Sequence, residues 1–213
     1  MIPPKTSAHR LMVEGKDDLH TVIHLLRRHG LDYDDPSLDL PYIHDGGGYS
    51  SLLDALPVAA KSYKRLGVVI DADLEPRVRW TEVRCRLKTV GVELPETPNG
   101  VGTVVSGMTT DCRVGVWLMP DNSGEGTLET FLSRLVPAGD ACWGHAGVVA
   151  REAKSLGARY PNKYFSKAQI HTWLAWHEEP GQPFGTAITS ACFSTDTRDA
   201  IAFVAWFKQL FLE

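Results

Sequence analysis

The order of apolar and polar residues predicts alternating strands and helices in the first half of the chain. Short apolar runs are typical of buried strands, and apolar residues three and four apart are typical of amphipathic helices. The patterns predict strands over residues 9–13, 38–43 and 67–70, and helices over 19–29, 49–64 and 76–89. We expect the second helix to be interrupted or kinked near Pro57, because proline lacks a backbone donor. Strands that alternate with helices predict βαβ units around a parallel sheet.

Beyond residue 100 the pattern predicts a hairpin and then helices. Strands are expected over 102–105 and 113–119, paired as a hairpin, with helices over 127–135, 145–156, 166–176 and 197–212. The last helix is strongly apolar and is expected to pack on the sheet. We therefore predict one α/β domain over residues 1–213. Its Rossmann-like sheet of about four to five mostly parallel strands is sandwiched by helices, within a core at about 8–135 and a helical C-terminal part at about 137–213.

The apolar run from Val68 to Ile70 ends in two acidic residues, Asp71 and Asp73. Continuous apolar residues are typical of a strand that is buried on both faces in a parallel sheet. Because alternate residues of a strand share a face, we expect the two carboxylates to point at one divalent cation. The alternative is that they cap the helix expected from residue 76, since aspartate is a common N-cap.

Acidic residues follow three of the predicted strands. The groups are Glu14 with Asp17 and Asp18, Asp71 with Asp73, and Asp121 with Glu125 and Glu129. Sites of open α/β sheets form beyond the carboxyl ends of the strands, so these acids are expected to converge there. Converging carboxylates repel one another unless a cation lies among them, and oxygen ligands favour Mg²⁺ or Mn²⁺. Such an ion polarises phosphate or activates a water.

Composition narrows the possible functions. The 213 residues carry a net charge of −4, which argues against a protein that coats nucleic acid non-specifically. No apolar run approaches the roughly 20 residues of a membrane span, and no signal peptide is apparent, so a cytoplasmic location is expected. The four cysteines form no C-x-x-C pair and are expected to be reduced. His20 and His24, four apart, lack the further ligands of a zinc site.

Two of these segments together resemble the signature of the Toprim domain. They are Val13-Glu14-Gly15-x-x-Asp18 after the first strand and Asp71-x-Asp73 after a later one. That domain occurs in topoisomerases, bacterial primases, recombination-mediator proteins and OLD-family nucleases. The third segment, Pro120-Asp121-Asn122 with Gly126-x-Leu128-Glu129, resembles small stand-alone Toprim-like bacterial proteins of largely uncharacterised function. The resemblance covers roughly residues 8–135.

The resemblance implies a Toprim-like sheet with Glu14 as general acid/base and Asp71 and Asp73 as Mg²⁺ ligands. These three are the expected catalytic residues. It also implies a metal role for Asp18 and makes Glu125 and Glu129 candidates for further ligands. The chain departs from the larger members because it carries no ATPase domain, DNA-gate domain or catalytic-tyrosine region. We therefore expect neither a topoisomerase nor a complete OLD nuclease.

Several glycines and lysines are candidates for contacts with phosphate. Gly47 lies in a Gly46-Gly47-Gly48 run before a helix, where backbone N–H groups can approach a phosphate, although the run is equally typical of a flexible turn. The other candidates are Gly15, Lys16, Lys163 and Lys167. Basic residues on the helix over 76–89 are consistent with either a phosphate-tracking patch or a solvated face.

The sequence leads to two hypotheses of function. The first is a Mg²⁺-dependent phosphoryl-transfer enzyme, a nuclease that acts on the phosphodiesters of DNA or RNA. The alternative is a catalytically silent or partner-dependent Toprim-like module that works with a separate ATPase, as in phage defence. A small-molecule phosphatase of the haloacid-dehalogenase type fits less well. There the D-x-D follows the first strand, whereas here the first strand ends in Glu14.

Overall fold

The protein is built around a five-stranded, mostly parallel sheet. A computed structural model describes residues 7–213. The strands are β1 (His9–Val13), β2 (Tyr42–Asp45), β3 (Arg65–Asp71), β4 (Thr103–Ser106) and β5 (Arg113–Met119). They lie in the order β2-β1-β3-β5-β4, in which only the edge strand β4 runs antiparallel to its neighbour. The carboxyl ends of β1, β2, β3 and β5 therefore meet at one edge of the sheet.

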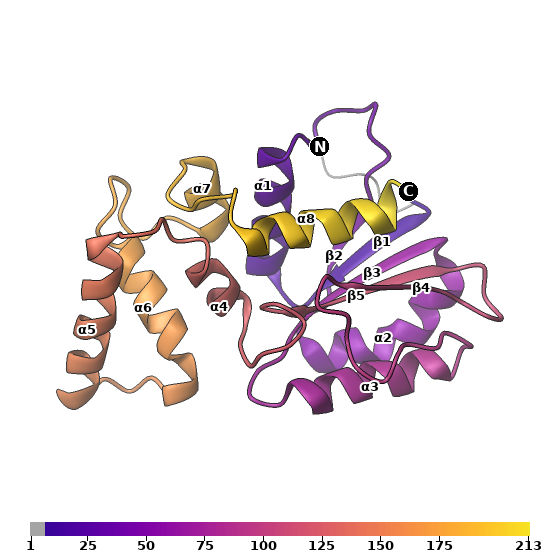
Figure 1. The fold of residues 1–213 in the computed structure, drawn as a ribbon, viewed down its shortest axis with the longest axis horizontal. Helices are drawn as coiled ribbons and strands as arrows, with labels where there is room; N and C mark the ends of the chain where they lie inside the picture. Colours follow the sequence, from indigo (N-terminus) through magenta and orange to yellow (C-terminus); the bar gives the residue numbers. More distant parts are fainter. Residues whose placement is uncertain (1–6) are drawn as a thin grey trace.

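Helices cover both faces of the sheet, as Figure 1 shows. The helices are α1 (Lys16–Arg28), α2 (Tyr49–Ser62), α3 (Pro76–Lys88), α4 (Leu128–Ser133), α5 (Ala141–Ser155), α6 (Phe165–Leu174), α7 (Phe184–Thr189) and α8 (Arg198–Phe211), with a short 3₁₀ turn at Asn162–Tyr164. Helices α2 and α3 lie on one face and α1 and α8 on the other. The predicted α/β class is confirmed, as are the hairpin of β4 with β5 and the packing of the last helix on the sheet.

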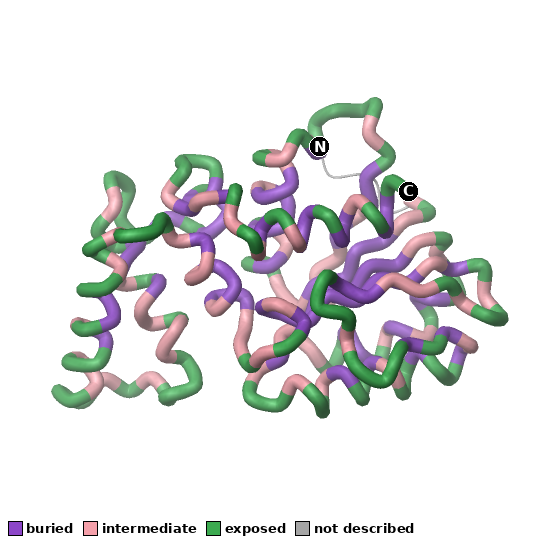
Figure 2. Tube along the Cα trace, viewed as in Figure 1, coloured by how far each residue is buried: buried purple, intermediate pink, exposed green. Residues whose placement is uncertain are grey.

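The alternation of side chains along β3 divides the core into two layers. Leu66, Val68 and Ile70 belong to the apolar cluster with α2 and α3, whereas Val69 belongs to the cluster with α1 and α8. Figure 2 shows the strands as the buried centre of the molecule. Val68 and Val69 are both inaccessible to solvent, which is why the strand reads as a continuous apolar run.

Glycine permits the close approach of α8 to the sheet. A Cβ on Gly67 would lie 2.6 Å from Cδ1 of Leu11 and 2.9 Å from Cζ of Phe211. A Cβ on Gly115, the neighbour of Gly67 in β5, would lie 2.5 Å from Cδ2 of Leu210. The two glycines therefore form a flat strip on which the end of α8 rests.

The C-terminal helices continue the core rather than forming a separate one. Ile170 and Trp173 of α6 belong to the same apolar cluster as Val69 and Trp117 of the sheet. Helix α7 packs on α1, and α6 contacts both α4 and α5. Figure 1 shows α5 and α6 as a hairpin that extends beyond the end of the sheet where β3 and β5 finish. We call residues 141–174 the α5–α6 arm.

Several predicted boundaries were wrong, each for a local reason. Helix α1 begins at Lys16 rather than residue 19, because Gly15 is extended and its N–H is bound by Asp18 within the first turn. Strand β2 begins only at Tyr42, since Pro41 has no N–H for a ladder. Helix α2 continues through Pro57 without interruption. The short helix α7 was not predicted.

Two further expectations concern the chain as a whole. None of the helices formed by residues 7–213 has the length and apolar character needed to cross a membrane. The four cysteines are all free thiols, of which Cys112 is buried and Cys85 and Cys142 are exposed.

Candidate active site at the carboxyl edge of the sheet

An acidic pocket lies where the parallel strands end. Its volume is about 590 Å³, and residues that follow β1, β2 and β3 line it together with the first residues of α4 and two residues of the α5–α6 arm. The lining residues are Glu14, Gly15, Lys16, Asp17, Asp18, Asp45, Gly48, Asp71, Asp73, Thr127, Leu128, Glu129, Tyr164 and Lys167. The convergence predicted for the acids after β1 and β3 is therefore present in the fold.

Backbone N–H groups orient the two central carboxylates. The N–H of Asp71, the last residue of β3, donates to Oε1 of Glu14 at 2.8 Å. Oδ1 of Asp71 in turn accepts a hydrogen bond of 2.9 Å from the N–H of Leu128, the first residue of α4. This chain of bonds links the ends of β1 and β3 to the N-terminus of α4, where a negative charge is stabilised. Each bond uses one carboxylate oxygen, so each side chain can present its other oxygen to a ligand.

Asp18 is buried because it lies in the first turn of α1 under the loop that follows β1. It is 9% exposed, and its Oδ2 accepts a hydrogen bond of 3.2 Å from the N–H of Gly15. Burial, followed by the charge of Glu14, raises the pKa of Asp18 to about 7. A partly protonated aspartate near neutral pH indicates that the protein does not supply enough positive charge at this position.

The pKa values of two neighbouring acids, Asp71 and Glu14, are also raised. Burial, followed by the charges of Asp18 and Glu14, raises the pKa of Asp71 well above its ordinary value. Burial also raises the pKa of Glu14, although the hydrogen bond from Asp71 acts in the opposite direction. Perturbed carboxylates that share a pocket are characteristic of functional sites.

Glu129 differs because it has a cationic partner. Its Oε1 lies 2.8 Å from Nζ of Lys167 on α6, and its Oε2 accepts a hydrogen bond of 2.7 Å from Thr127. Burial acts to raise the pKa of Glu129, but the bonds from Lys167 and Thr127 lower it on balance. Lys167 thus lies beside the acids, and it joins the α5–α6 arm to the wall of the pocket.

The expectation that Asp71 and Asp73 share one strand face was wrong. β3 ends at Asp71, and Asp73 has a left-handed backbone with φ 51° that forms a bridge to Gly126. The carboxylate of Asp73 is 39% exposed and is paired with Arg79, whose guanidinium stacks on the ring of Tyr49. Asp73 still lines the rim of the pocket, but its carboxylate is held by Arg79.

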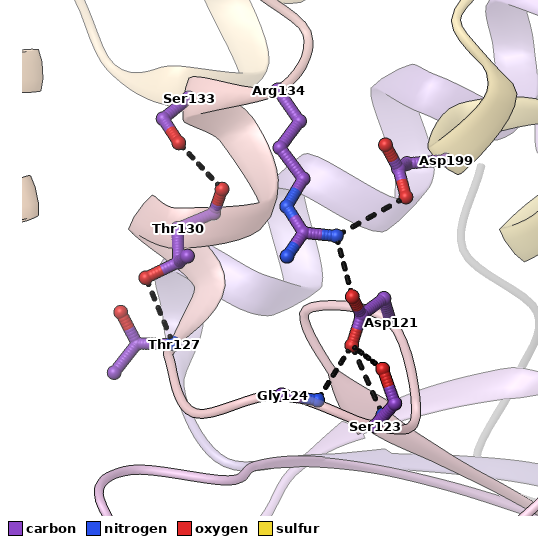
Figure 3. Close-up of polar contacts among 8 residues, drawn as sticks. All are labelled: Asp121, Ser123, Gly124, Thr127, Thr130, Ser133, Arg134 and Asp199. Carbon is purple, nitrogen blue, oxygen red and sulfur yellow. Dashed lines mark hydrogen bonds and ion pairs between the residues drawn. The ribbon is translucent and has the colours of Figure 1, made fainter. Parts of the chain in front are cut away.

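The third acidic segment divides into structural and pocket residues. Asp121 accepts hydrogen bonds from Ser123 and Gly124 and pairs with Arg134 at 2.7 Å; Arg134 also contacts Asp199 of α8 (Figure 3). These contacts hold the loop after β5 against α4 and α8. Glu125 is exposed and does not line the pocket, so the structure gives no support to its predicted role as a ligand. Of the three acids in this segment, only Glu129 lines the pocket.

The predicted phosphate-binding residues lie in different places. Gly15 and Lys16 line the pocket, as does Lys167. Gly47 is exposed and outside the pocket, and its N–H donates to Oδ1 of Asp45, so the structure gives no support to its predicted contact with phosphate. Lys163 lines an adjoining pocket of about 370 Å³ together with Asp73 and Arg79.

Asp45 and Tyr164 also line the pocket, although the sequence did not single them out. Asp45 carried the same signal as the other acids, because it comes two residues after a predicted strand. Tyr164 carried no comparable signal, since its position depends on how the α5–α6 arm packs against α4.

The donor set of the pocket fits a hard divalent cation. Glu14, Asp18 and Asp71 offer carboxylate oxygens. Burial raises the pKa of all three, and repulsion raises those of Asp18 and Asp71 further, an effect that such an ion would relieve. Yet among residues 7–213 no three Asp, Glu, His or Cys side chains already form a metal-coordinating group. The chemistry therefore fits, while ligation requires side chains to turn toward the ion.

The fold and this pocket define a Rossmann-like α/β protein with an acidic site at the carboxyl edge of its sheet. The chain belongs to the DUF3226 family, described as a protein of unknown function, whose family model matches residues 8–212. No curated protein and no solved structure matched the chain.

Proposed function

We propose that this protein is a divalent-metal-dependent phosphoryl-transfer enzyme, a nuclease that acts on nucleic-acid phosphodiesters through a Toprim-like acidic site. The observation that carries the proposal is the convergence of Glu14, Asp18 and Asp71 in one pocket, where burial raises the pKa of each carboxyl and repulsion raises the pKa values of Asp18 and Asp71 further. Buried carboxylates are unfavourable together unless a cation lies among them. Mg²⁺ or Mn²⁺ is the proposed cofactor, because all the donors are oxygens.

Each residue has a distinct role in this proposal. Glu14, Asp18 and Asp71 are the proposed ligands, with Glu129 as a further one and Asp73 at the rim. Oε1 of Glu14 is engaged by the N–H of Asp71, so Oε2 is the atom that serves either as a ligand of the ion or as the base for an attacking water. When bound, the ion would neutralise charge on the scissile phosphate and lower the pKa of water.

The charge of the α5–α6 arm supports nucleic acid as the substrate. The arm carries five Lys and Arg residues against one Glu, a net charge of +4, whereas the whole chain carries −4. The basic residues are Arg151, Lys154, Arg159, Lys163 and Lys167. A local basic surface beside an acidic pocket attracts a phosphate backbone without requiring the whole protein to be basic.

The arm also forms one side of the route into the pocket. Tyr164 and Lys167 line the acidic pocket, and Lys163 lines the adjoining one. Both pockets include Asp73, so they adjoin at this residue. Tyr164 is 41% exposed and offers a ring on which an unpaired base can stack. These features favour a single strand as the substrate.

A second candidate is a catalytically silent or partner-dependent module. The observation that favours it is that two acids of the pocket are already paired, Glu129 with Lys167 and Asp73 with Arg79. In this case a separate ATPase would bind and rearrange these pairs before the pocket could hold an ion. The two candidates differ in whether the purified chain acts alone.

The test is cleavage of plasmid DNA, single-stranded DNA and RNA by the purified protein with Mg²⁺ or Mn²⁺. We expect cleavage that is lost with EDTA and reduced at least about a hundredfold by Asp71→Asn or Glu14→Gln. Glu96→Gln is the matched control, because Glu96 is an exposed acid on the loop between α3 and β4.

Three outcomes separate the candidates. Cleavage that survives both pocket substitutions contradicts the proposed site. Wild-type protein that binds Mn²⁺ but cleaves nothing alone, and that gains activity with an ATPase partner, favours the second candidate. Failure to bind Mn²⁺ or Mg²⁺ contradicts the metal-dependent proposal.

A further inference from the structure

A second pocket lies at the opposite end of the sheet, where β1, β3 and β5 begin. Its volume is about 640 Å³, and it is bounded by the loop before β5 and by the end of α8. The lining residues are His9, Asp39, Lys64, Arg65, Ser106, Gly107, Thr110, Asp111, Cys112, Arg113, Phe211 and Leu212. Because β3 rises about 3.3 Å per residue, its first residue lies roughly 20 Å from Asp71 at its other end. The two pockets are therefore separate.

Two arginines lie side by side in this second pocket. Arg65 of β3 and Arg113 of β5 are direct partners in the parallel register, on the sheet face that also carries Gly67 and Gly115. Neighbouring strands are only about 4.8 Å apart. Like charges placed directly opposite each other destabilise a sheet. The arrangement therefore has an electrostatic cost that a bound anion would remove.

Neither arginine is neutralised by an acidic side chain of residues 7–213. Four other arginines each contact an aspartate, namely Arg27, Arg79, Arg86 and Arg134. In the second pocket Asp39 pairs with His9 at 3.2 Å, and Asp111 forms no ion pair with Arg65 or Arg113. With Lys64 the pocket carries three fixed positive charges against two negative ones.

We propose that this second pocket binds a phosphate monoester. Guanidinium groups on neighbouring strands can each donate a pair of hydrogen bonds to one phosphate. Lys64 supplies a third positive charge at the edge of the pocket. The volume exceeds that of a phosphate and lies in the range of small-molecule sites, and Leu212, 42% exposed, offers an apolar surface to the rest of the ligand.

A structural role for the arginines is the competing explanation. The pocket lies at the C-terminus of α8, whose partial negative charge favours nearby cations. That role predicts that removing an arginine lowers the thermal stability, and that the wild-type pocket does not bind phosphate. Phosphate-specific binding that depends on Arg113 is therefore the decisive measurement.

The test is calorimetric titration of the full chain in EDTA, which keeps divalent metal out of the acidic pocket. The probes are AMP, inorganic phosphate and adenosine, together with a short oligonucleotide with or without a 5′-phosphate. We expect AMP to bind and adenosine not to bind. Arg113→Gln should weaken AMP binding by about tenfold or more. Arg113→Lys should give an intermediate loss, because lysine retains the positive charge but lacks the paired N–H donors of a guanidinium. Arg77→Gln, an exposed arginine of α3, is the control.

The arms of this test distinguish two sources of the ligand. Tighter binding of the 5′-phosphorylated oligonucleotide than of AMP identifies a strand end, and the reverse identifies a free nucleotide. Circular dichroism checks that the variants are folded, and Arg65→Lys replaces Arg113→Gln if the latter is not. Equal binding of AMP and adenosine, binding unchanged by the arginine variants, or no binding of any phosphate probe to wild type would overturn the proposal.

Discussion

The backbone N–H of Asp71 donates a hydrogen bond to Oε1 of Glu14, with a distance of 2.8 Å between the two atoms. One side chain therefore has two separable roles, because Glu14 accepts this bond and also offers a charge to the pocket. Glu14→Gln should keep the bond through the amide oxygen and leave stability nearly unchanged. Glu14→Ala should leave the Asp71 N–H without its acceptor and cost about 1–3 kcal/mol.

Both Glu14 variants should lose Mn²⁺ affinity, since neither carries the negative charge. Urea denaturation measures the first effect and titration with Mn²⁺ the second. Wild-type Mn²⁺ affinity in Glu14→Gln would show that Glu14 only joins β1 to β3.

Glu129 and Glu125 should respond differently to the same substitution. Glu129 lines the pocket and pairs with Lys167, whereas Glu125 is exposed outside it. We expect Glu129→Gln to weaken Mn²⁺ binding by about tenfold and Glu125→Gln to change it less than about twofold. Titration with Mn²⁺ of both variants checks this, and equal losses would mean that the loop carrying Glu125 moves into the pocket when the ion binds.

The sequence predicted the acids that follow strands directly and failed at those that depend on loop conformation. Glu14, Asp18 and Asp71 meet because the ends of parallel strands share one edge, which the order of elements already implies. Asp73 has a left-handed backbone conformation, which strand periodicity does not predict. Glu125 and Glu129 are four residues apart, and only the start of α4 between them determines which one faces the pocket.

Strand bounds were predictable where a clear apolar pattern coincides with the observed strand. They were missed where hydrogen bonding or contacts between distant helices decide the structure. β1 and β5 were predicted with their observed bounds. Leu38 and Leu40 suggested a strand, yet they lie in turns before Pro41 because the ladder with β1 begins at Tyr42. The position of the α5–α6 arm beside the pocket depends on contacts between distant helices, which no local pattern encodes.

Gly115→Ala should destabilise the fold, because its Cβ would lie 2.5 Å from Cδ2 of Leu210 and would move α8 off the sheet. Overpacking of this kind costs about 1–3 kcal/mol. Gly144→Ala in α5 is the matched control, since a Cβ there meets nothing within 4 Å. It should stabilise the protein by up to about 1 kcal/mol through helix propensity. Urea denaturation of both variants measures the difference, and equal effects would contradict the close packing of α8.

The metal-free protein should become less stable as the pH rises from about 4 to about 7. The pKa of Asp18 is raised to about 7 in the folded chain, mainly by burial, whereas an unfolded aspartate titrates near about 4. Between these values the folded state binds more protons than the unfolded state, so rising pH favours unfolding. The raised pKa values of Glu14 and Asp71 act in the same direction. Asp18→Asn should flatten this dependence.

Urea midpoints in EDTA at about pH 5 and about pH 8 measure this dependence. Mn²⁺ should restore stability mainly at the higher pH, where the carboxylates are ionised. A wild-type midpoint that rises with pH over this range would contradict the assigned environment of Asp18.

Nucleic-acid binding should depend on the α5–α6 arm and on salt. Lys163 and Tyr164 are exposed and adjacent, yet they would contact different parts of a strand, the phosphate and the base. Lys163→Gln should remove one phosphate contact. The slope of log affinity against log salt should then fall by about 0.7, the value per contact for a single strand. Tyr164→Ala should leave that slope unchanged and cost about 1–3 kcal/mol through lost stacking.

Fluorescence anisotropy in EDTA with single-stranded and duplex DNA of equal length separates the two effects, because EDTA prevents cleavage. Lys208→Gln on α8 is the control, since Lys208 lies outside the arm. An equal preference for duplex, or an affinity that neither arm variant changes, would remove the arm from substrate binding and leave the acidic pocket to be tested by cleavage alone.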